Sequence, residues 1–598
     1  MNRPRGETGG LRGEDATKPK NLKIQTMYAM MNICPVACCL LLAACRLPPA
    51  ACCLLSAACC LLPAACCLLP GCEDYGASET GTPAASMVNA APTEGGAANH
   101  APQNEVPESC PLQMGMRMMF NKLSPSDAIS MKQSLQAGQK RLLVGTSFSG
   151  CEILSKVLSE LSHQWTQMLD STLEFCVLWA CEESDSKRNF IRDQFPHIPA
   201  LFEKMEKLSE VKAFDHVTKK FIIVAWVHIF AAGFTCTSRS RQNSASAGNK
   251  GCVRNAESAT GVAYELVRLF IARKRPPLVL LENVTPLLED GDMSDAAYIK
   301  ESLAKLQYAV EHMVICAEEY GSRTDRQRLF FVAVDISDLN NGSKVAGVFF
   351  TLMRNTLQGL KIPRIDLDYF IWDPDGVAEV SHTGKAARMD PLFKDEHLEI
   401  FQGEGYDWPP KLLDAPAHLV DVLSQSSERI REVIIFADRK YPFKHPVGAK
   451  EFLDANASLS RLTQSSNPWK PNQVPTLTTS AKIVVREMLI DDEVQCYYLH
   501  GLCSMALIGW DLPMYATPTS ATHEELVHFA GMAFNAFAVG ALLIAVFTHW
   551  PPRPDMCHRR MMVPSLHSSS HSDGDEQSGT DLEDDKDSTS GIGNSQVP

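Results

Sequence analysis

Short apolar runs alternate with amphipathic stretches from about Leu123 to Trp550, and this alternation restricts the chain to a few architectures. Apolar runs of about four to eight residues are typical of buried strands, and helical periodicity between them is typical of βαβ connections. The runs predict strands at Arg141–Thr146, Glu174–Ala180, His228–Ala232, Leu278–Leu281 and Leu329–Val334. We therefore expect an α/β core, with helices between the strands at Ile153–Leu169, Ser186–Gln194 and Gly261–Ala272.

One apolar run near the C-terminal end is long enough to need a separate interpretation. Phe534–Trp550 has 17 residues and contains Asn535 and Gly540. A membrane-spanning helix needs about 20 apolar residues, so a buried core helix is the better interpretation. We expect no membrane partner from this segment.

The flanks of the core have a different composition. A unit rich in Ala, Cys and Leu occurs three times with a period of seven between Pro49 and Leu69. Proline recurs in its register, and a proline inside a helix costs about 3 kcal/mol, so the tract does not favour the continuous helix of a coiled coil. We interpret this tract as low complexity, with a membrane or targeting segment as the alternative. The polar leader Met1–Thr26 is poorly shaped for a signal peptide.

The net charge and the cysteine pattern bear on the kind of partner, on metal sites and on the redox compartment. The formal net charge is −14, of which −7 lies between Asp573 and Asp587. Overall charge therefore neither predicts nor excludes a nucleic-acid partner. Eleven of the 21 cysteines lie between Cys34 and Cys72, and the others form no CxxC pair. We expect no zinc module or other metal site and no disulfide framework, and a reducing compartment.

Two features could bind a nucleotide-like ligand. The segment Val144–Glu152 leaves a predicted strand through a glycine-bearing turn, where a ligand can approach the backbone. The next strand ends at Glu182 and Glu183, and an acidic residue there can accept hydrogen bonds from a ribose diol. A plain strand–helix connection and a solvated carboxylate are the alternatives.

Three further features carry reactive groups. Cys236 follows a strand in a polar loop, although a lone cysteine can also be a small core residue. Glu282 ends an apolar strand, where burial would raise its pKa, or it caps the next helix. Arg326 and Arg328 would point to the same face of an extended segment, as two cations beside the site or as a solvated face.

The order and spacing of these features resemble the DNA (cytosine-5) methyltransferase family. Distal segments agree with it: Val474–Ser480 is similar to a late Pro-Thr-x-Thr motif, and Ile508–Asp511 with Phe529–Asn535 is similar to a closing helix motif. The resemblance covers roughly Leu142–Val546. It implies a Rossmann-like class I methyltransferase core with a smaller target-recognition region.

The resemblance also implies a cofactor and roles for the candidate residues. S-adenosylmethionine would lie against Phe148, Ser149 and Gly150, and Glu182 or, with a shifted register, Glu183 would hold its ribose. Cys236 would add to carbon 6 of a flipped cytosine. Glu282 would hydrogen-bond ring nitrogen 3, and Arg326 and Arg328 would hold the base. DNA is the implied partner, with RNA as the alternative substrate.

Several positions depart from the family pattern. Thr235 precedes Cys236 where proline is usual, Met532 stands where asparagine is usual, and His228 stands where aspartate is common. Thr324 replaces a glutamine, and the first motif has Thr146 and Glu152 where aspartate and glycine are common. A slow enzyme or an inactive, DNA-binding or scaffolding relative is therefore the alternative.

These features divide the chain into five predicted regions. Residues 1–122 form a low-complexity, disordered region, 123–336 the catalytic core, and 337–472 the target-recognition region; residues 473–550 complete the core, and 551–598 form an acidic disordered tail. The third region holds the best local basic cluster, which an ordinary solvated face would equally explain: Arg429, Arg431, Arg439, Lys440 and Lys444. A DNA substrate makes the nucleus the expected location, with organelle targeting or membrane association through the repeats as alternatives.

Overall fold

The predicted strands are neighbours in one large sheet, which confirms the α/β fold. The computed structural model describes residues 110–136, 141–169, 171–235, 238–239, 250–289, 291–337, 341–371, 391–411, 415–491, 493–510 and 521–550. In this part of the chain, nine strands lie in the order β5-β4-β3-β2-β1-β6-β7-β9-β8. Their bounds are β1 Arg141–Ser147, β2 Glu174–Cys181, β3 Ala200–Phe202, β4 Lys212–Asp215, β5 Lys220–Ile223, β6 Ile229–Ala232, β7 Leu278–Asn283, β8 Tyr308–Cys316 and β9 Gln327–Asp335.

The sheet has a parallel centre with antiparallel edges. Strands β3, β2, β1, β6 and β7 run parallel, and β4, β5, β9 and β8 pair antiparallel. The strand order reverses between β1 and β6, which are hydrogen-bonded neighbours. In open α/β sheets, ligands bind beyond the carboxyl ends of the strands at such a reversal. The fold therefore places the described candidate residues, at the carboxyl ends of β1, β2 and β7, on the same edge of the sheet close to this reversal.

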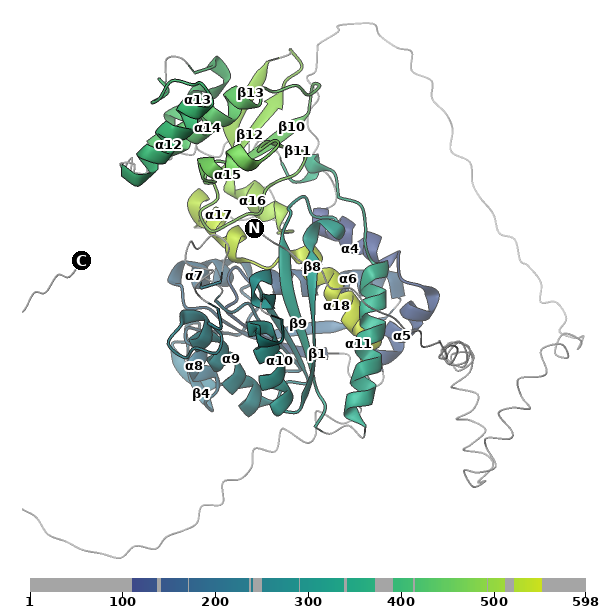
Figure 1. The fold of residues 1–598 in the computed structure, drawn as a ribbon. Helices are drawn as coiled ribbons and strands as arrows, with labels where there is room; N and C mark the ends of the chain where they lie inside the picture. Colours follow the sequence, from purple (N-terminus) through teal and green to yellow (C-terminus); the bar gives the residue numbers. More distant parts are fainter. Residues whose placement is uncertain are drawn as a thin grey trace, which may run out of the picture. The chain divides into compact units, whose positions relative to one another are not determined.

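Alternating side chains bury both faces of the sheet. Val144, Ala180 and Ile229 pack into one apolar core, and Trp179, Phe230 and Val279 pack into a second. This period of two matches the pleat of a strand. Helices lie over both faces (Figure 1): α4 Pro111–Phe120, α5 Pro125–Gln136, α6 Ile153–Leu169, α7 Asp185–Gln194, α8 Met205–Leu208, α9 Ala259–Lys274, α10 Asp295–Lys305 and α11 Gly342–Gly359.

The last helix confirms the interpretation of the long apolar run. Helix α18, Ala536–His549, contacts α4, α5, α6 and α11, and its residues from Ala536 to Thr548 are buried. The stretch His523–His549 is apolar enough to cross a membrane by composition, but 89% of its most apolar window is buried inside the protein. Its hydrophobicity is therefore accounted for by the core.

A smaller sheet has its own apolar core. Strands β10 Lys450–Asp454, β11 Lys470–Pro471, β12 Ile483–Met488 and β13 Val494–Tyr498 form it in the order β11-β10-β12-β13. Four helices accompany it: α12 Pro391–Gly403, α13 Val420–Ser424, α14 Glu428–Lys440 and α15 Leu459–Gln464. Phe401, Phe436, Trp469 and Val484 are buried in this third core. After it, α16 Gly501–Leu507 and α17 His523–Met532 precede α18.

Two predicted boundaries need correction. The N-terminal region was expected to reach residue 122, but α4 packs on α6 and α18 with Leu112 and Met116 buried. The region expected at 337–472 is displaced, because α11 packs on α18 of the main core while β12 and β13 belong to the small sheet. The domain to which a helix or strand belongs depends on the element that it packs against. The sequence pattern does not indicate which element that is. The predicted regions before residue 110 and after residue 550 lie outside the described residues.

Candidate active site

The glycine-bearing turn after β1 leaves open space beside its backbone. Phe148 and Gly150 have positive φ angles of 51° and 59°. A Cβ atom added at Gly150 would meet nothing within 4 Å, so the turn has room on that side. Ser149 joins the turn to the end of β2, because its backbone N–H donates to the Cys181 carbonyl at 3.2 Å. The three predicted residues of this turn thus lie beside the end of the next strand.

Glu182 lies against this glycine turn. Its Oε2 accepts from the Gly150 N–H at 2.9 Å, and its Oε1 accepts from the Ser184 N–H at 3.1 Å. Glu182 is buried, whereas Glu183 is exposed. The structure thus brings Glu182, and not Glu183, to the glycine turn, and this favours Glu182 as the acid beside a ligand. The carboxylate has four lone-pair sites, so capacity remains for a ligand's hydroxyl donors.

Glu152, where the family commonly has glycine, is a buried acid next to this turn. Its carboxylate accepts from the Thr146 hydroxyl at 2.6 Å and from the Ser155 hydroxyl at 2.9 Å. Burial raises its pKa, although these hydrogen bonds act in the opposite direction. Thr146 and Glu152, two of the departures noted above, therefore form one hydrogen-bonded unit.

This unit gives a pH-dependent prediction. In the folded protein the pKa of Glu152 lies above its ordinary value of 4.5, so the folded state keeps the proton to a higher pH than the unfolded state. Glu152 therefore lowers the free energy of unfolding as the pH rises above about 4.5. Glu152→Gln cannot titrate. We expect the stability of this variant relative to wild type to increase as pH rises from about 4, measured by urea unfolding at several pH values. A relative stability that is constant with pH would contradict the assignment.

On the other side of the switch point, Glu282 lies beside the start of the loop that follows β6. It is 8% exposed, and its Oε1 lies 3.0 Å from Nε of Arg328. Burial raises the pKa of Glu282, and the charges of Arg328 and Arg326 oppose that shift. A Cβ added at Gly233 would lie 2.6 Å from the Phe534 ring and 3.5 Å from the Glu282 carboxylate, so a glycine is needed at this close approach.

The predicted nucleophile, Cys236, lies outside the described residues. The chain is described as far as Thr235, and the loop start is anchored because the Asn283 amide donates to the Phe234 carbonyl at 3.1 Å. Since β6 and β7 are parallel neighbours, the chain leaves β6 at the same edge of the sheet as Glu282. The described segment therefore starts the loop near the buried acid.

Arg326 and Arg328 lie in different surroundings, and that both hold a base stays a prediction. Arg326 is 2% exposed, and its guanidinium donates to the carbonyls of Leu477, Ala530, Gly531 and Ala533 at 2.5–3.4 Å. Its donors therefore hold the closing segments of the chain. Arg328 forms an ion pair with the Glu282 carboxylate.

The distal motifs converge on the segment that contains Arg326. The Val474 N–H donates to the Arg323 carbonyl at 3.0 Å, and a Cβ at Gly531 would overlap the Thr478 backbone. Asn535 donates to the hydroxyls of Ser322 and Thr324. Thr324, which replaces the expected glutamine, is thus a buried member of this network. These contacts join segments that lie far apart in sequence into one network.

Most of the predicted basic cluster serves the small domain itself. Arg429 donates to the Asn456 carbonyl, Arg431 donates to the Leu423 carbonyl, and Lys440 pairs with Glu404. Arg439 lies over the Tyr406 ring. Lys444 is exposed. The cluster is therefore not a free cationic patch on one helix face.

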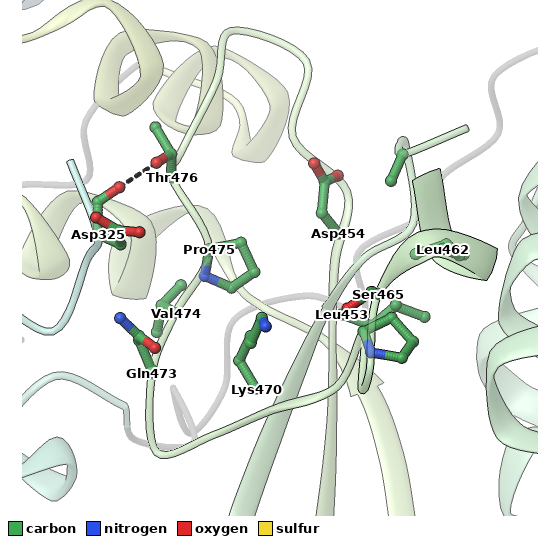
Figure 2. A pocket seen from close by; sticks show the side chains of 12 residues that line it. Asp325, Leu453, Asp454, Leu462, Ser465, Lys470, Gln473, Val474, Pro475 and Thr476 are labelled. Atoms are coloured by element: carbon green, nitrogen blue, oxygen red, sulfur yellow. Dashed lines mark hydrogen bonds between the residues drawn. The ribbon is translucent and has the colours of Figure 1, made fainter. Parts of the chain in front are cut away.

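A cavity of about 260 Å³ lies between the small sheet and the loop before β9. Figure 2 shows Asp325, Asp454 and Lys470 around it, with the hydrogen bond from Thr476 to Asp325. None of the predicted cofactor or catalytic residues described here lines this cavity. Nearby, Asp325, Cys316 and Glu318 lie close enough to share a cation, but Glu318 is already paired with Arg364.

Lys187, a buried cation beside Glu182, is a site residue that the sequence motifs do not single out. Lys187 lies in the first turn of α7 and is 4% exposed. Together with Phe190 and Ile191 it forms the buried face of that helix at i, i+3 and i+4 spacing. That spacing is the signal that could have identified it.

Comparisons with known proteins agree with the resemblance. Residues 196–362 match the family described as C-5 cytosine-specific DNA methylase. The Type II methyltransferase M.SsoII of Shigella sonnei is 26% identical over 113 residues, which are 19% of this chain and 28% of that protein. The aligned stretch therefore spans less than a third of that relative.

Two solved structures align over most of their length. The methyltransferase EhMeth of Entamoeba histolytica is 10% identical with a TM-score of 0.37, over 68% of this chain and 98% of that one. The Dnmt2 methyltransferase of S. pombe is 11% identical with a TM-score of 0.33, over 68% of this chain and 98% of that one.

Proposed function

We propose that this chain, whose residues 196–362 match the family described as C-5 cytosine-specific DNA methylase, transfers a methyl group from S-adenosylmethionine to carbon 5 of cytosine in DNA. The observation that carries the proposal is the arrangement at the switch point. The Gly150–Glu182 contact lies on one side of β1, and the Glu282–Arg328 pair lies beside β6. A cofactor site and a base site would thus be neighbours. A DNA substrate would place the protein in the nucleus.

The residues of the first motif suit S-adenosylmethionine. Glu182 retains acceptor capacity for a ribose diol, and the space beside Gly150 admits a ligand to the backbone. Phe148 offers a partly exposed aromatic surface. When bound, the cofactor supplies an electrophilic methyl group on a sulfonium.

The residues of the second side suit cytosine activation. Carbon 5 of cytosine is a weak nucleophile, so the base must be flipped out of the duplex and activated. The Cys236 thiolate would form a bond to carbon 6, which divides one difficult step into two. Protonated Glu282 would donate to ring nitrogen 3, where negative charge develops. After transfer, loss of the carbon 5 proton would break the Cys236–carbon 6 bond and restore the thiolate.

Glu282 must hold a proton for this role, and its surroundings act in two directions. Burial raises its pKa and favours the protonated acid, while Arg328 at 3.0 Å favours the carboxylate. Arg328 would then offset negative charge on the base once Glu282 is neutral.

A methyl-transfer assay tests the proposal. Purified protein is incubated with S-adenosylmethionine labelled in its methyl group and with cytosine-containing duplex DNA or transfer RNA as the acceptor. We expect label in the 5-methylcytosine of DNA. Label only in RNA would move the substrate to RNA. Cofactor and DNA binding without any transfer would favour the inactive relative.

Glu182→Ala should weaken S-adenosylmethionine binding. Loss of a charged hydrogen-bond partner costs about 1.5–3 kcal/mol, and calorimetry on the folded variant would measure it. Glu183→Ala is the matched control, because that carboxylate is exposed. If the control weakened binding and Glu182→Ala did not, the ribose would be held by the other acid.

A further inference from the structure

Lys187 is a buried ammonium group at the edge of the proposed cofactor site. Its Nζ lies 3.6 Å from Oε1 of Glu182 and 3.1 Å from the Met532 sulfur. It therefore bridges α7, which follows the ribose-binding acid, and the end of α17. Met532 occupies the position where asparagine is usual in the resembling family.

The contacts of Lys187 leave most of its hydrogen-bonding capacity unused. An ammonium has three donors, and a thioether is a weak acceptor. The 3.6 Å approach to Glu182 is longer than an ordinary hydrogen bond, so this contact is an ion pair without a hydrogen bond. A buried ammonium is costly unless it is paired and hydrogen-bonded.

Arg188, the next residue of α7, differs from Lys187 in its hydrogen-bond partners. Arg188 is also buried, but it donates to the carbonyls of Glu182 and Glu183 and pairs with Asp185. Its charge is used within the protein. Lys187 instead points toward the thioether of a residue that is 48% exposed. A ligand that covers Met532 would therefore meet the Lys187 ammonium.

The chemistry of the cofactor identifies the group that Lys187 would bind. S-adenosylmethionine carries a sulfonium, an amino group and a single anionic group, the carboxylate of its methionine part. We propose that Lys187 binds that carboxylate, and this inference rests on the function proposed above. Lys187 then supplies a hydrogen-bond donor beside Met532, whose thioether has none, unlike an asparagine amide. It acts as a binding residue for the cofactor and takes no part in the chemistry.

Two ligands that differ in the amino-acid part, which carries this carboxylate, test the inference. S-adenosylhomocysteine retains the amino-acid part, and 5′-methylthioadenosine lacks it. Calorimetry measures the affinity of both for wild type, Lys187→Met and Lys187→Arg. We expect Lys187→Met to weaken S-adenosylhomocysteine binding about ten- to hundredfold, the range for one charged hydrogen bond. Binding of 5′-methylthioadenosine should change less than about threefold, and Lys187→Arg should retain most of the affinity.

Lys207→Met is the control for the loss of one positive charge, because Lys207 is an exposed lysine paired with Glu210. Thermal unfolding verifies that each variant is folded, and Lys187→Gln replaces Lys187→Met if the latter is not. Equal weakening of both ligands, or of neither, would overturn the inference and leave the proposed function intact. Failure of the wild-type protein to bind either ligand would overturn both.

Discussion

Wild-type protein should form a denaturation-resistant adduct with DNA that contains 5-fluorocytosine, and Cys236→Ser should form none. Fluorine at carbon 5 cannot leave as a proton does, so the bond between sulfur and carbon 6 would persist. A serine hydroxyl is not ionised at neutral pH and is a weak nucleophile here. We also expect methyl transfer to fall by on the order of a thousandfold or more, while S-adenosylmethionine binding remains. Gel mobility after denaturation measures the adduct.

The described cysteines near the site make poor substitutes for Cys236. Burial raises the pKa of Cys252 to about 11 and that of Cys151 to about 12, and it raises the pKa of Cys181 well above its ordinary value. The thiolate is the reactive form, so these groups are largely unreactive near neutral pH. An adduct that survives Cys236→Ser would place the nucleophile elsewhere. Absence of an adduct from wild type that binds both DNA and cofactor would favour the inactive relative.

Arg326→Met should destabilise the protein by about 3–5 kcal/mol, the range for losing several charged hydrogen bonds in a buried place. The substitution would leave four backbone carbonyls without their donor, and these carbonyls lie up to 207 residues away in the sequence. Urea unfolding measures the change. Arg326→Lys should recover only part of it, because an ammonium cannot reproduce the planar array of guanidinium donors.

Arg328→Met is the matched control for this prediction. Arg328 is partly exposed, and Glu282 can take up a proton when its partner is lost, since burial already raises its pKa. We therefore expect a smaller loss of stability than for Arg326→Met. Equal losses of stability for the two variants would contradict the idea that the hydrogen bonds of Arg326 to the closing segments stabilise the protein more than the Arg328–Glu282 pair does.

The sequence by itself determined the positions of the central strands. It also placed the candidate residues at the carboxyl ends of these strands. The predicted strands differ from β1, β2, β6, β7 and β9 by at most two residues at either end. Apolar runs mark strands wherever a sheet is covered on both faces, so this information is local. The same locality placed the glycine turn, Glu182 and Glu282 at strand ends. It also identified the apolar run near the end of the chain as a core helix.

Only the tertiary structure decided which of these groups touch. It separated Arg326 from Arg328, selected Glu182 over Glu183, and brought Lys187 to Met532 across 345 residues of sequence. It also placed β12 and β13 in the small sheet and α11 on the main core. Periodicity records whether a side chain is buried, because burial depends on one face of one element. It does not record the partner, because a hydrogen bond or ion pair depends on two segments whose approach is set by the packing of the whole core.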